Sequence, residues 1–110
     1  MKVGIIRCAQ TEDFCPGTTD FKAIAKRMGA FEGIDEEITI TGFISCGGCP
    51  GKKAVLRARE LVKRGADTIV FASCMKKGTP IGYPCPHFQQ IRDIVADDLG
   101  PFIRIIDYTH

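Results

Sequence analysis

The alternation of apolar and amphipathic segments constrains the fold of this chain more than any other sequence feature. Apolar runs of strand length lie at 3–7, 38–44, 68–72 and 102–106, and the segments between them carry apolar residues at helical spacing. Strands that alternate with helices are joined by right-handed crossovers, which makes the strands parallel and places helices on both faces of the sheet. We therefore expect an α/β fold with three layers, α/β/α, around a four-stranded parallel sheet.

The second and fourth of these strands are less apolar than the other two. Threonines alternate with isoleucines in 38–44, and Arg104 interrupts 102–106. Partly solvated strands belong at the edges of a sheet, whereas the almost wholly apolar run 68–72 suits a central position. The expected strand order is therefore 2-1-3-4, a truncated flavodoxin-like sheet. The length of the chain predicts a single domain over 1–110.

The segment Ser45–Lys53, with the sequence SCGGCPGKK, connects the second strand to the second helical segment. It places Cys46 and Cys49 in a strand-to-helix turn. Proline is frequent at the first position of a helix, so Pro50 predicts a helix that begins there, with Cys49 at or near its N-cap. The unpaired amides and the dipole at such a helix end favour the thiolate form of a cysteine.

The six cysteines all follow strands or lie in the loops after them. The strands of a parallel sheet end at one edge, where open α/β folds bind their ligands, and neighbouring strands lie only about 4.8 Å apart. Buried turn cysteines can simply pack, but cysteines used as core filler would also appear inside strands and helices. The residues that we expect at the site are Cys8, Cys46, Cys49, Cys74, Cys85 and His87, and the pattern leaves Cys15 and His110 unassigned.

Metal binding is the first functional hypothesis, because zinc takes four thiolate or imidazole ligands in a tetrahedral arrangement. The inner donors that we expect are Cys8, Cys46, Cys49 and Cys74, with Cys85 and His87 as substitutes or a second site. Three cysteines are followed by proline, as in ferredoxins. The close Cys-x-x-Cys-x-x-Cys run is absent, however, so an iron–sulfur cluster ranks behind zinc.

Dithiol chemistry is the alternative hypothesis. Cys46 and Cys49, beside Lys52 and Lys53, could shuttle between thiol and disulfide as an oxidoreductase or a redox sensor. Thioredoxin-like proteins, however, carry such a motif in a mixed sheet and use a later cis-proline that this sequence does not identify. The sequence alone does not decide whether the protein is an enzyme, and it names no substrate or protein partner.

Composition argues against several other classes. The net charge of +2 is too small to indicate nucleic-acid binding, and the basic residues of 52–64 fit a solvated helix face. No apolar run approaches the roughly 18 residues of a membrane span, and no signal peptide precedes the first strand, so we expect a cytoplasmic protein. In that reducing compartment, cysteines bind metals or react rather than form permanent disulfides.

With these residues assembled, the sequence resembles the CGGC domain family over the whole chain. The specific part is the segment 42–52, GFISCGGCPGK. Weaker matches occur at Arg7-Cys8, Cys15-Pro16-Gly17, Ser73-Cys74, Cys85-Pro86-His87 and Thr109-His110. The resemblance implies a metal-binding domain, with zinc suggested by its cysteines and histidines, and it adds weight to His87 and His110.

Overall fold

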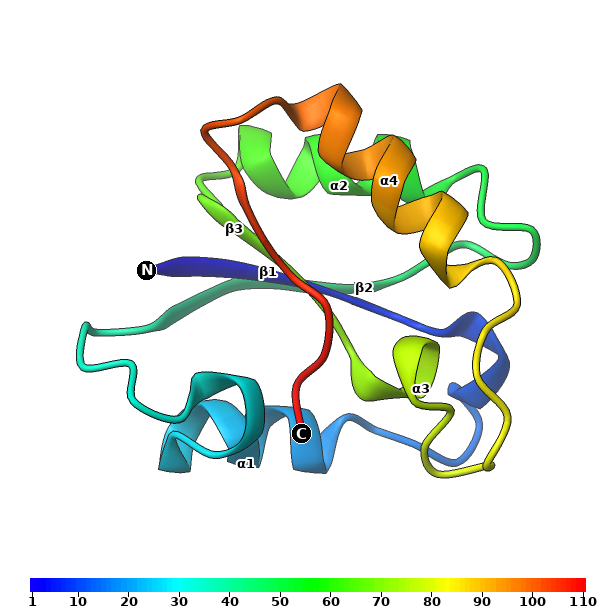
Figure 1. Cartoon of the computed structure of the whole chain (residues 1–110), viewed down its shortest axis with the longest axis horizontal. Helices are drawn as coiled ribbons and strands as arrows, with labels where there is room; N and C mark the ends of the chain where they lie inside the picture. Colours follow the sequence, from blue (N-terminus) through cyan, green and yellow to red (C-terminus); the bar gives the residue numbers. More distant parts are fainter.

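The four strands form one parallel sheet in the order β2-β1-β3-β4. A computed structural model describes all residues 1–110 (Figure 1). The strands are β1 (Lys2–Arg7), β2 (Thr39–Ser45), β3 (Thr68–Phe71) and β4 (Arg104–Ile106). The structure confirms the predicted α/β class and the predicted strand order 2-1-3-4.

Helices cover both faces of this sheet. Figure 1 shows α2 and α4 on one face and α1 and α3 on the other, so the fold has three layers. The helices are α1 (Thr18–Lys26), α2 (Ala54–Lys63), α3 (Ser73–Lys76) and α4 (Phe88–Leu99), with short 3-10 helices η1 (Ala9–Thr11) and η2 (Gly29–Phe31). None of the helices combines the length and the apolar character needed to span a membrane.

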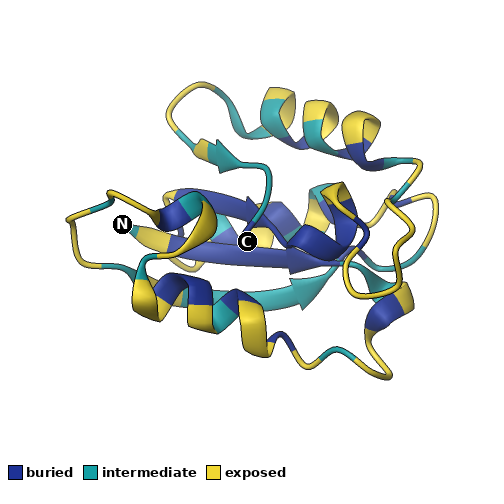
Figure 2. Cartoon of the chain, turned by 60° about the horizontal axis from the view of Figure 1, so that its bottom comes forward, coloured by how far each residue is buried: buried dark blue, intermediate teal, exposed yellow.

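The core lies around the two central strands. In β3 every residue is buried, and in β1 only Lys2 is exposed. The edge strands β2 and β4 contain no buried residue, as their mixed composition predicts (Figure 2). Leu61 of α2 packs directly over the sheet, because Gly4 of β1 and Gly42 of β2 leave room for its side chain.

The turn after β2 is longer than the sequence indicates. The prediction that the second helix begins at Pro50, with Cys49 near its N-cap, is wrong, because α2 begins at Ala54 and its N-cap is Lys53. Gly51 has a φ of 94°, and a Cβ at this position would lie 2.2 Å from the Ile91 side chain of α4. Gly51 has a left-handed conformation and packs against α4, and it lies between the cysteine turn and α2.

The close contact between Gly4 and Leu61 makes the central strand intolerant of a larger residue. A Cβ on Gly4 would lie 2.9 Å from Leu61 Cδ1, so we expect Gly4→Ala to lower the free energy of unfolding by about 1–3 kcal/mol. Urea denaturation measures this cost. In a Leu61→Ala background the cost of Gly4→Ala should shrink, because the clash is gone, and an equal cost in both backgrounds would contradict the packing described.

Candidate thiol site

The ends of the parallel strands bring three cysteines to one edge of the sheet. Arg7 pairs with Ser45 in the register of β1 and β2, so Cys8 and Cys46 both follow directly after a paired position. The pairing continues past the strand, because the Cys46 amide donates a hydrogen bond to the Arg7 carbonyl at 2.7 Å. Cys74 follows β3, in the short helix α3 rather than in an open turn.

Two of the thiols, those of Cys8 and Cys85, have raised pKa values. Burial raises the pKa of Cys8, and the negative charges of the Cys46 and Cys49 thiolates raise it further. Burial also raises the pKa of Cys85, and Cys8, Cys46 and Cys49 all act on it in the same direction. The backbone brings these residues to the same edge, because Cys8 and Cys46 follow paired residues of β1 and β2 and the Cys85 amide is bound to the Met75 carbonyl of α3. We call Cys8, Cys46, Cys49 and Cys85 the rim cluster.

The two cysteines of the central motif differ in exposure. Cys46 is buried, and Cys49 is exposed. The Cys49 sulfur has only one polar contact, a long one of 3.9 Å from the Gln10 side-chain amide. The motif therefore presents one fixed thiol and one whose side chain can turn without breaking a strong interaction.

Cys85 reaches the rim cluster from the loop that precedes α4. Its amide donates a hydrogen bond to the Met75 carbonyl at 2.8 Å, which ties this loop to the end of α3. Burial raises the pKa of Cys85, and the backbone of His87 partly offsets this effect. His87 is half-buried at the N-cap position of α4, where its imidazole makes no capping hydrogen bond.

The thiols of the rim cluster are suitable ligands for zinc, but in this conformation they are not arranged to hold the ion. Four thiol sulfurs are a common ligand set for this ion. In this conformation, however, no three cysteine, histidine, aspartate or glutamate side chains are grouped closely enough to hold a metal ion. The cluster supplies neighbouring donors, and coordination would require the side chains to converge.

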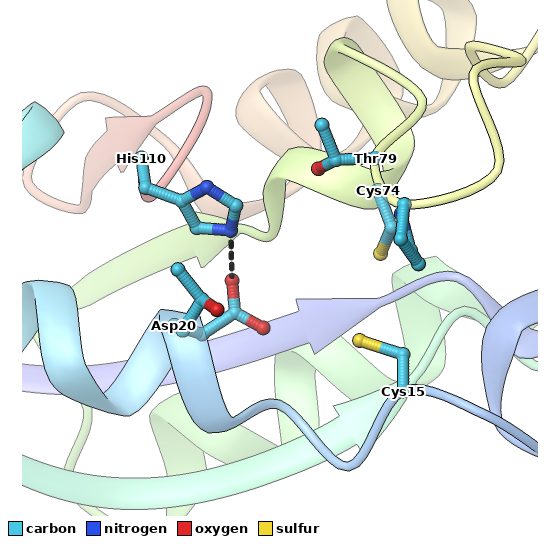
Figure 3. A pocket seen from close by; sticks show the side chains of 7 residues that line it. Cys15, Asp20, Cys74, Thr79 and His110 are labelled. Carbon is cyan, nitrogen blue, oxygen red and sulfur yellow. Dashed lines mark ion pairs between the residues drawn. The ribbon is translucent and has the colours of Figure 1, made fainter.

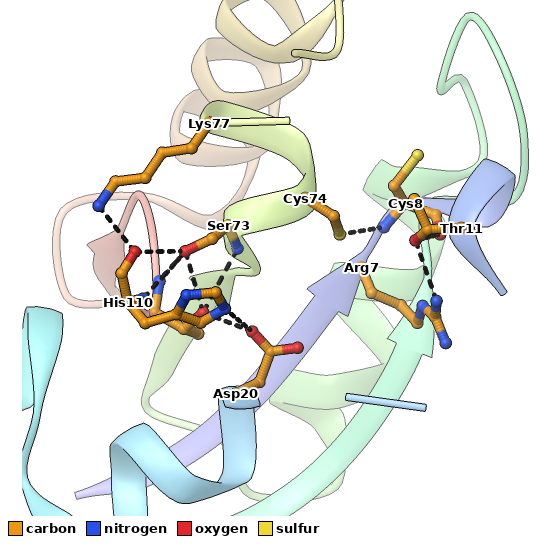
Figure 4. A network of polar contacts seen from close by, with 9 residues as sticks. Arg7, Cys8, Thr11, Asp20, Ser73, Cys74, Lys77 and His110 are labelled. Atoms are coloured by element: carbon orange, nitrogen blue, oxygen red, sulfur yellow. Dashed lines mark hydrogen bonds and ion pairs between the residues drawn. The ribbon is translucent and has the colours of Figure 1, made fainter. Parts of the chain in front are cut away.

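Cys74 faces a different environment from the rim cluster. Its sulfur accepts a hydrogen bond from the Cys8 amide at 3.2 Å, while the Cys8 side chain points away from it (Figure 4). The sulfur points into a cavity of about 80 Å³. Figure 3 shows that Cys15, Asp20 and His110 surround the same space. The residues that line this cavity are Cys15, Thr19, Asp20, Cys74, Thr79, Pro80 and His110.

A buried polar network holds His110 and Asp20 in this wall. Asp20, in the first turn of α1, accepts a hydrogen bond from the Thr109 hydroxyl, and its Oδ1 lies 3.6 Å from His110 Nε2. The Ser73 hydroxyl accepts hydrogen bonds from the amides of Thr109 and His110 at 3.1 and 2.9 Å. Figure 4 shows how Ser73 and Asp20 fasten this segment between α3 and α1.

Arg7, the last residue of β1, is a buried positive charge next to Cys8 in the chain. Its side chain is 7% exposed, and no acidic group contacts it. Nη2 donates to the Thr11 hydroxyl at 3.0 Å, the guanidinium lies 5.7 Å from the Phe43 ring centroid, and Nε has no hydrogen-bond partner. The Thr11 hydroxyl in turn donates to the Cys8 carbonyl at 3.1 Å, which connects Arg7 to the main chain of Cys8.

The CGGC domain family matches residues 2–110. The chain belongs to this family. It is 35% identical to Uncharacterized protein MJ0582 of Methanocaldococcus jannaschii over 118 aligned residues, which cover all of this chain and 87% of that protein. It is also 42% identical to Uncharacterized protein MJ0766 of the same organism over 38 residues, 34% of this chain and 58% of that protein. No solved structure matches the chain.

The structure of this CGGC domain separates the candidate residues into two groups, one in the rim cluster and one at the cavity. Sequence reasoning missed three polar side chains, those of Arg7, Thr11 and Asp20. Asp20 carried a usable signal, because it shares a helix face with the buried Ala23 and Ile24, where a carboxylate needs a partner. The rim cluster gathers Cys8, Cys46, Cys49 and Cys85, whereas Cys15, Cys74 and His110 line the cavity and His87 lies beside Cys85.

Because its thiols are buried, this CGGC domain should lose stability as the pH becomes alkaline. Burial raises the pKa of Cys74, so the folded protein keeps this proton at a pH where the unfolded chain has lost it. The free energy of unfolding is therefore unaffected at neutral pH and falls as the pH rises above about 9, by at most about 1.4 kcal/mol per pH unit for each such thiol.

Urea denaturation of the reduced, metal-free protein between pH 8 and 10.5 measures this slope. Cys74→Ala removes one of the responsible protons, so the decline should be shallower in this variant. The same slope in Cys74→Ala and in the wild-type protein would show that the Cys74 thiol is not shielded from water as described.

Proposed function

We propose that the rim cluster binds a divalent soft metal ion, with zinc the best match, through the sulfurs of Cys8, Cys46, Cys49 and Cys85. The observation that carries this proposal is the parallel pairing of β1 with β2, which brings Cys8 beside the Cys46–Cys49 turn at one edge of the sheet. Cys85 reaches the same edge from a third segment, and its pKa is raised by burial and by the charges of Cys8, Cys46 and Cys49. Membership of the CGGC domain family supports the same property. Four thiolates suit zinc because they are soft donors that adopt its tetrahedral arrangement without strain.

The electrostatics of the rim cluster favour a cation once the thiols ionise. Thiolates are the ligands, so a binding ion must displace protons, and the like charges that raise the pKa of Cys8 and Cys85 become attractive toward a divalent cation. Affinity for the ion should accordingly increase with pH. The exposed side chain of Cys49 provides the movement that closes the site, since only the long contact to Gln10 restrains it.

Cys74 and His87 remain the alternative fourth donors. Cys74 touches the Cys8 amide, so its sulfur is within reach of the same edge, and His87 follows Cys85 by two residues. Cys85 is preferred to both as the fourth donor because the charges of the other three thiols, in addition to burial, raise its pKa. Loss of metal in Cys85→Ser combined with retention in Cys74→Ser would agree with this order.

Cobalt(II) titration tests the proposal, because cobalt replaces zinc at thiolate sites and gives visible and near-ultraviolet absorption bands. We expect one equivalent to bind with tetrahedral bands and sulfur-to-metal charge transfer. Cys46→Ser and Cys49→Ser should each weaken binding by at least about 100-fold, since each removes a ligand. Glu12→Gln, which removes an exposed carboxylate near the same edge, should bind as the wild-type protein does.

The result that would contradict metal binding is a fully reduced protein that shows no cobalt bands. Equal affinity in Cys46→Ser and the wild-type protein would contradict the assignment of the central motif to the site.

Removal of the metal should leave the fold in place. The core contains 20 buried residues, of which only Cys46 belongs to the proposed metal site. We therefore expect the far-ultraviolet circular dichroism spectrum to keep its helical shape after treatment with a chelator. Conversion of the spectrum to that of a random coil would instead show that the ion is needed for folding.

A dithiol function of Cys46 and Cys49 is the second candidate. The observation in its favour is the pairing of one buried and one exposed thiol with two residues between them, which suits an attacking and a resolving cysteine. The helix end expected to activate these thiols is absent, because α2 begins at Ala54. A metal-free protein that rapidly forms a Cys46–Cys49 disulfide with a low-molecular-weight disulfide would favour this candidate over zinc.

A further inference from the structure

We propose that Arg57 of α2 is a positioning residue of the metal site, which holds the Cys46 end of the Cys46–Cys49 turn in place while the Cys49 side chain closes on the ion. This inference rests on the proposed function of the rim cluster. Arg57 contacts Ser45, the last residue of β2, which directly precedes Cys46. The contact joins the helix after the turn to the strand before it.

Arg57 donates two hydrogen bonds to one residue. Its Nη1 lies 2.9 Å from the Ser45 Oγ and 3.2 Å from the Ser45 carbonyl oxygen. The Ser45 Oγ also accepts a hydrogen bond from the Gly47 amide at 3.2 Å. The Cys46 amide itself donates to the Arg7 carbonyl at 2.7 Å. The residues on both sides of Cys46 are therefore tied together, and Arg57 is bound to the side chain that ties them.

The first half of the turn also packs against the start of α2. A Cβ on Gly47 would lie 2.6 Å from Lys53 Cβ and 3.3 Å from Arg57 Cζ, so the main chain of Gly47 rests directly on these two side chains. A Cβ on Gly48 would meet no atom within 4 Å. The helix therefore supports the half of the turn that carries the buried thiol and leaves the half that carries the exposed thiol open.

The Arg57 guanidinium has no partner other than Ser45. β2 is an edge strand, so no strand on its outer side donates to the Ser45 carbonyl, and Arg57 supplies the donor. No acidic side chain forms an ion pair with Arg57. Arg59, on the same helix, instead pairs with Asp98 of α4. One arginine of α2 thus holds the turn and the other joins two helices, which makes Arg59 a matched control.

A fixed Cys46 determines how the ion is held. Residues that orient metal ligands without touching the metal typically contribute about 10-fold to 100-fold to metal affinity. With Arg57 in place, only the Cys49 half of the turn needs to move when the ion enters or leaves. Without Arg57 both thiols of the turn can move, so the ion should leave faster.

Cobalt(II) binding to the full-length protein tests this inference. In Arg57→Met we expect the affinity for cobalt to fall at least about 10-fold, with faster transfer of the ion to a chelator and weaker tetrahedral bands, because the ligand geometry is less well defined. Arg59→Met should match the wild-type protein in all three measurements. Equal affinity and equal release rate in Arg57→Met and the wild-type protein would overturn the proposal.

A second substitution tests whether Arg57 acts through Ser45. Ser45→Ala removes the hydroxyl that receives the Arg57 hydrogen bond and binds the Gly47 amide. The affinity lost in the double variant should be smaller than the product of the fold-changes in Arg57→Met and Ser45→Ala, since both remove the same link. A loss equal to that product would contradict the proposed route.

Alkylation of the metal-free, reduced protein gives a readout that does not depend on the ion. Cys46 and Cys74 are 5% and 6% exposed, so iodoacetamide should label both slowly in the wild-type protein. In Arg57→Met we expect labelling of Cys46 to accelerate at least about fivefold, because opening of the turn no longer breaks a hydrogen bond from a charged donor. Labelling of Cys74 should be unchanged, which shows that the fold is intact.

The two readouts separate this inference from the proposed metal site. A wild-type protein without cobalt bands would contradict metal binding, and the labelling of Cys46 would still decide whether Arg57 holds the turn. Labelling of Cys46 at the same rate in Arg57→Met, Arg59→Met and the wild-type protein would overturn the positioning role, even in a protein that binds cobalt.

Discussion

The parallel register of β1 with its two neighbours determines where the reactive groups of this protein lie. Arg7 pairs with Ser45 and Ile6 pairs with Phe71, so the residues that follow these pairs leave the sheet side by side. The main-chain hydrogen bonds continue past the strand ends, from the Cys46 amide to Arg7 and from the Ala72 amide to Ile6. Thiols from three distant segments thereby meet at the carboxyl edge, and a shift of one residue in this register would turn them to opposite faces.

The backbone of Cys8 divides this edge into two environments. The Cys8 thiol belongs to the rim cluster, while its amide holds the Cys74 sulfur toward the cavity on the other side. The rim side contains an exposed thiol and few restraints, which suits an ion that binds and leaves. On the cavity side, hydrogen bonds from Thr109 to Asp20 and from the His110 amide to Ser73 hold the wall in place.

The fold class and strand order could be predicted from the sequence because they depend on local composition. An apolar run such as 68–72 has no stable place except the middle of a sheet, and Arg104 directs its strand to an edge. The start of α2 could not be predicted, because it depends on Gly51 meeting Ile91 of a helix that comes later in the chain. The cavity could not be predicted from the sequence either. Its walls come from α1, α3 and the segment after β4, which only the finished sheet brings together.

The central claim is that sulfurs from separate strands and loops share one ion, and X-ray absorption at the zinc edge of the loaded protein tests it most directly. The fine structure counts the sulfur neighbours of the metal. Four sulfurs at about 2.3 Å are expected, because the Cys46–Cys49 turn alone supplies only two and the others must come from other segments at the same edge. Two sulfurs or fewer, with nitrogen or oxygen completing the shell, would contradict the account, since the strand ends would then not converge on a common ion.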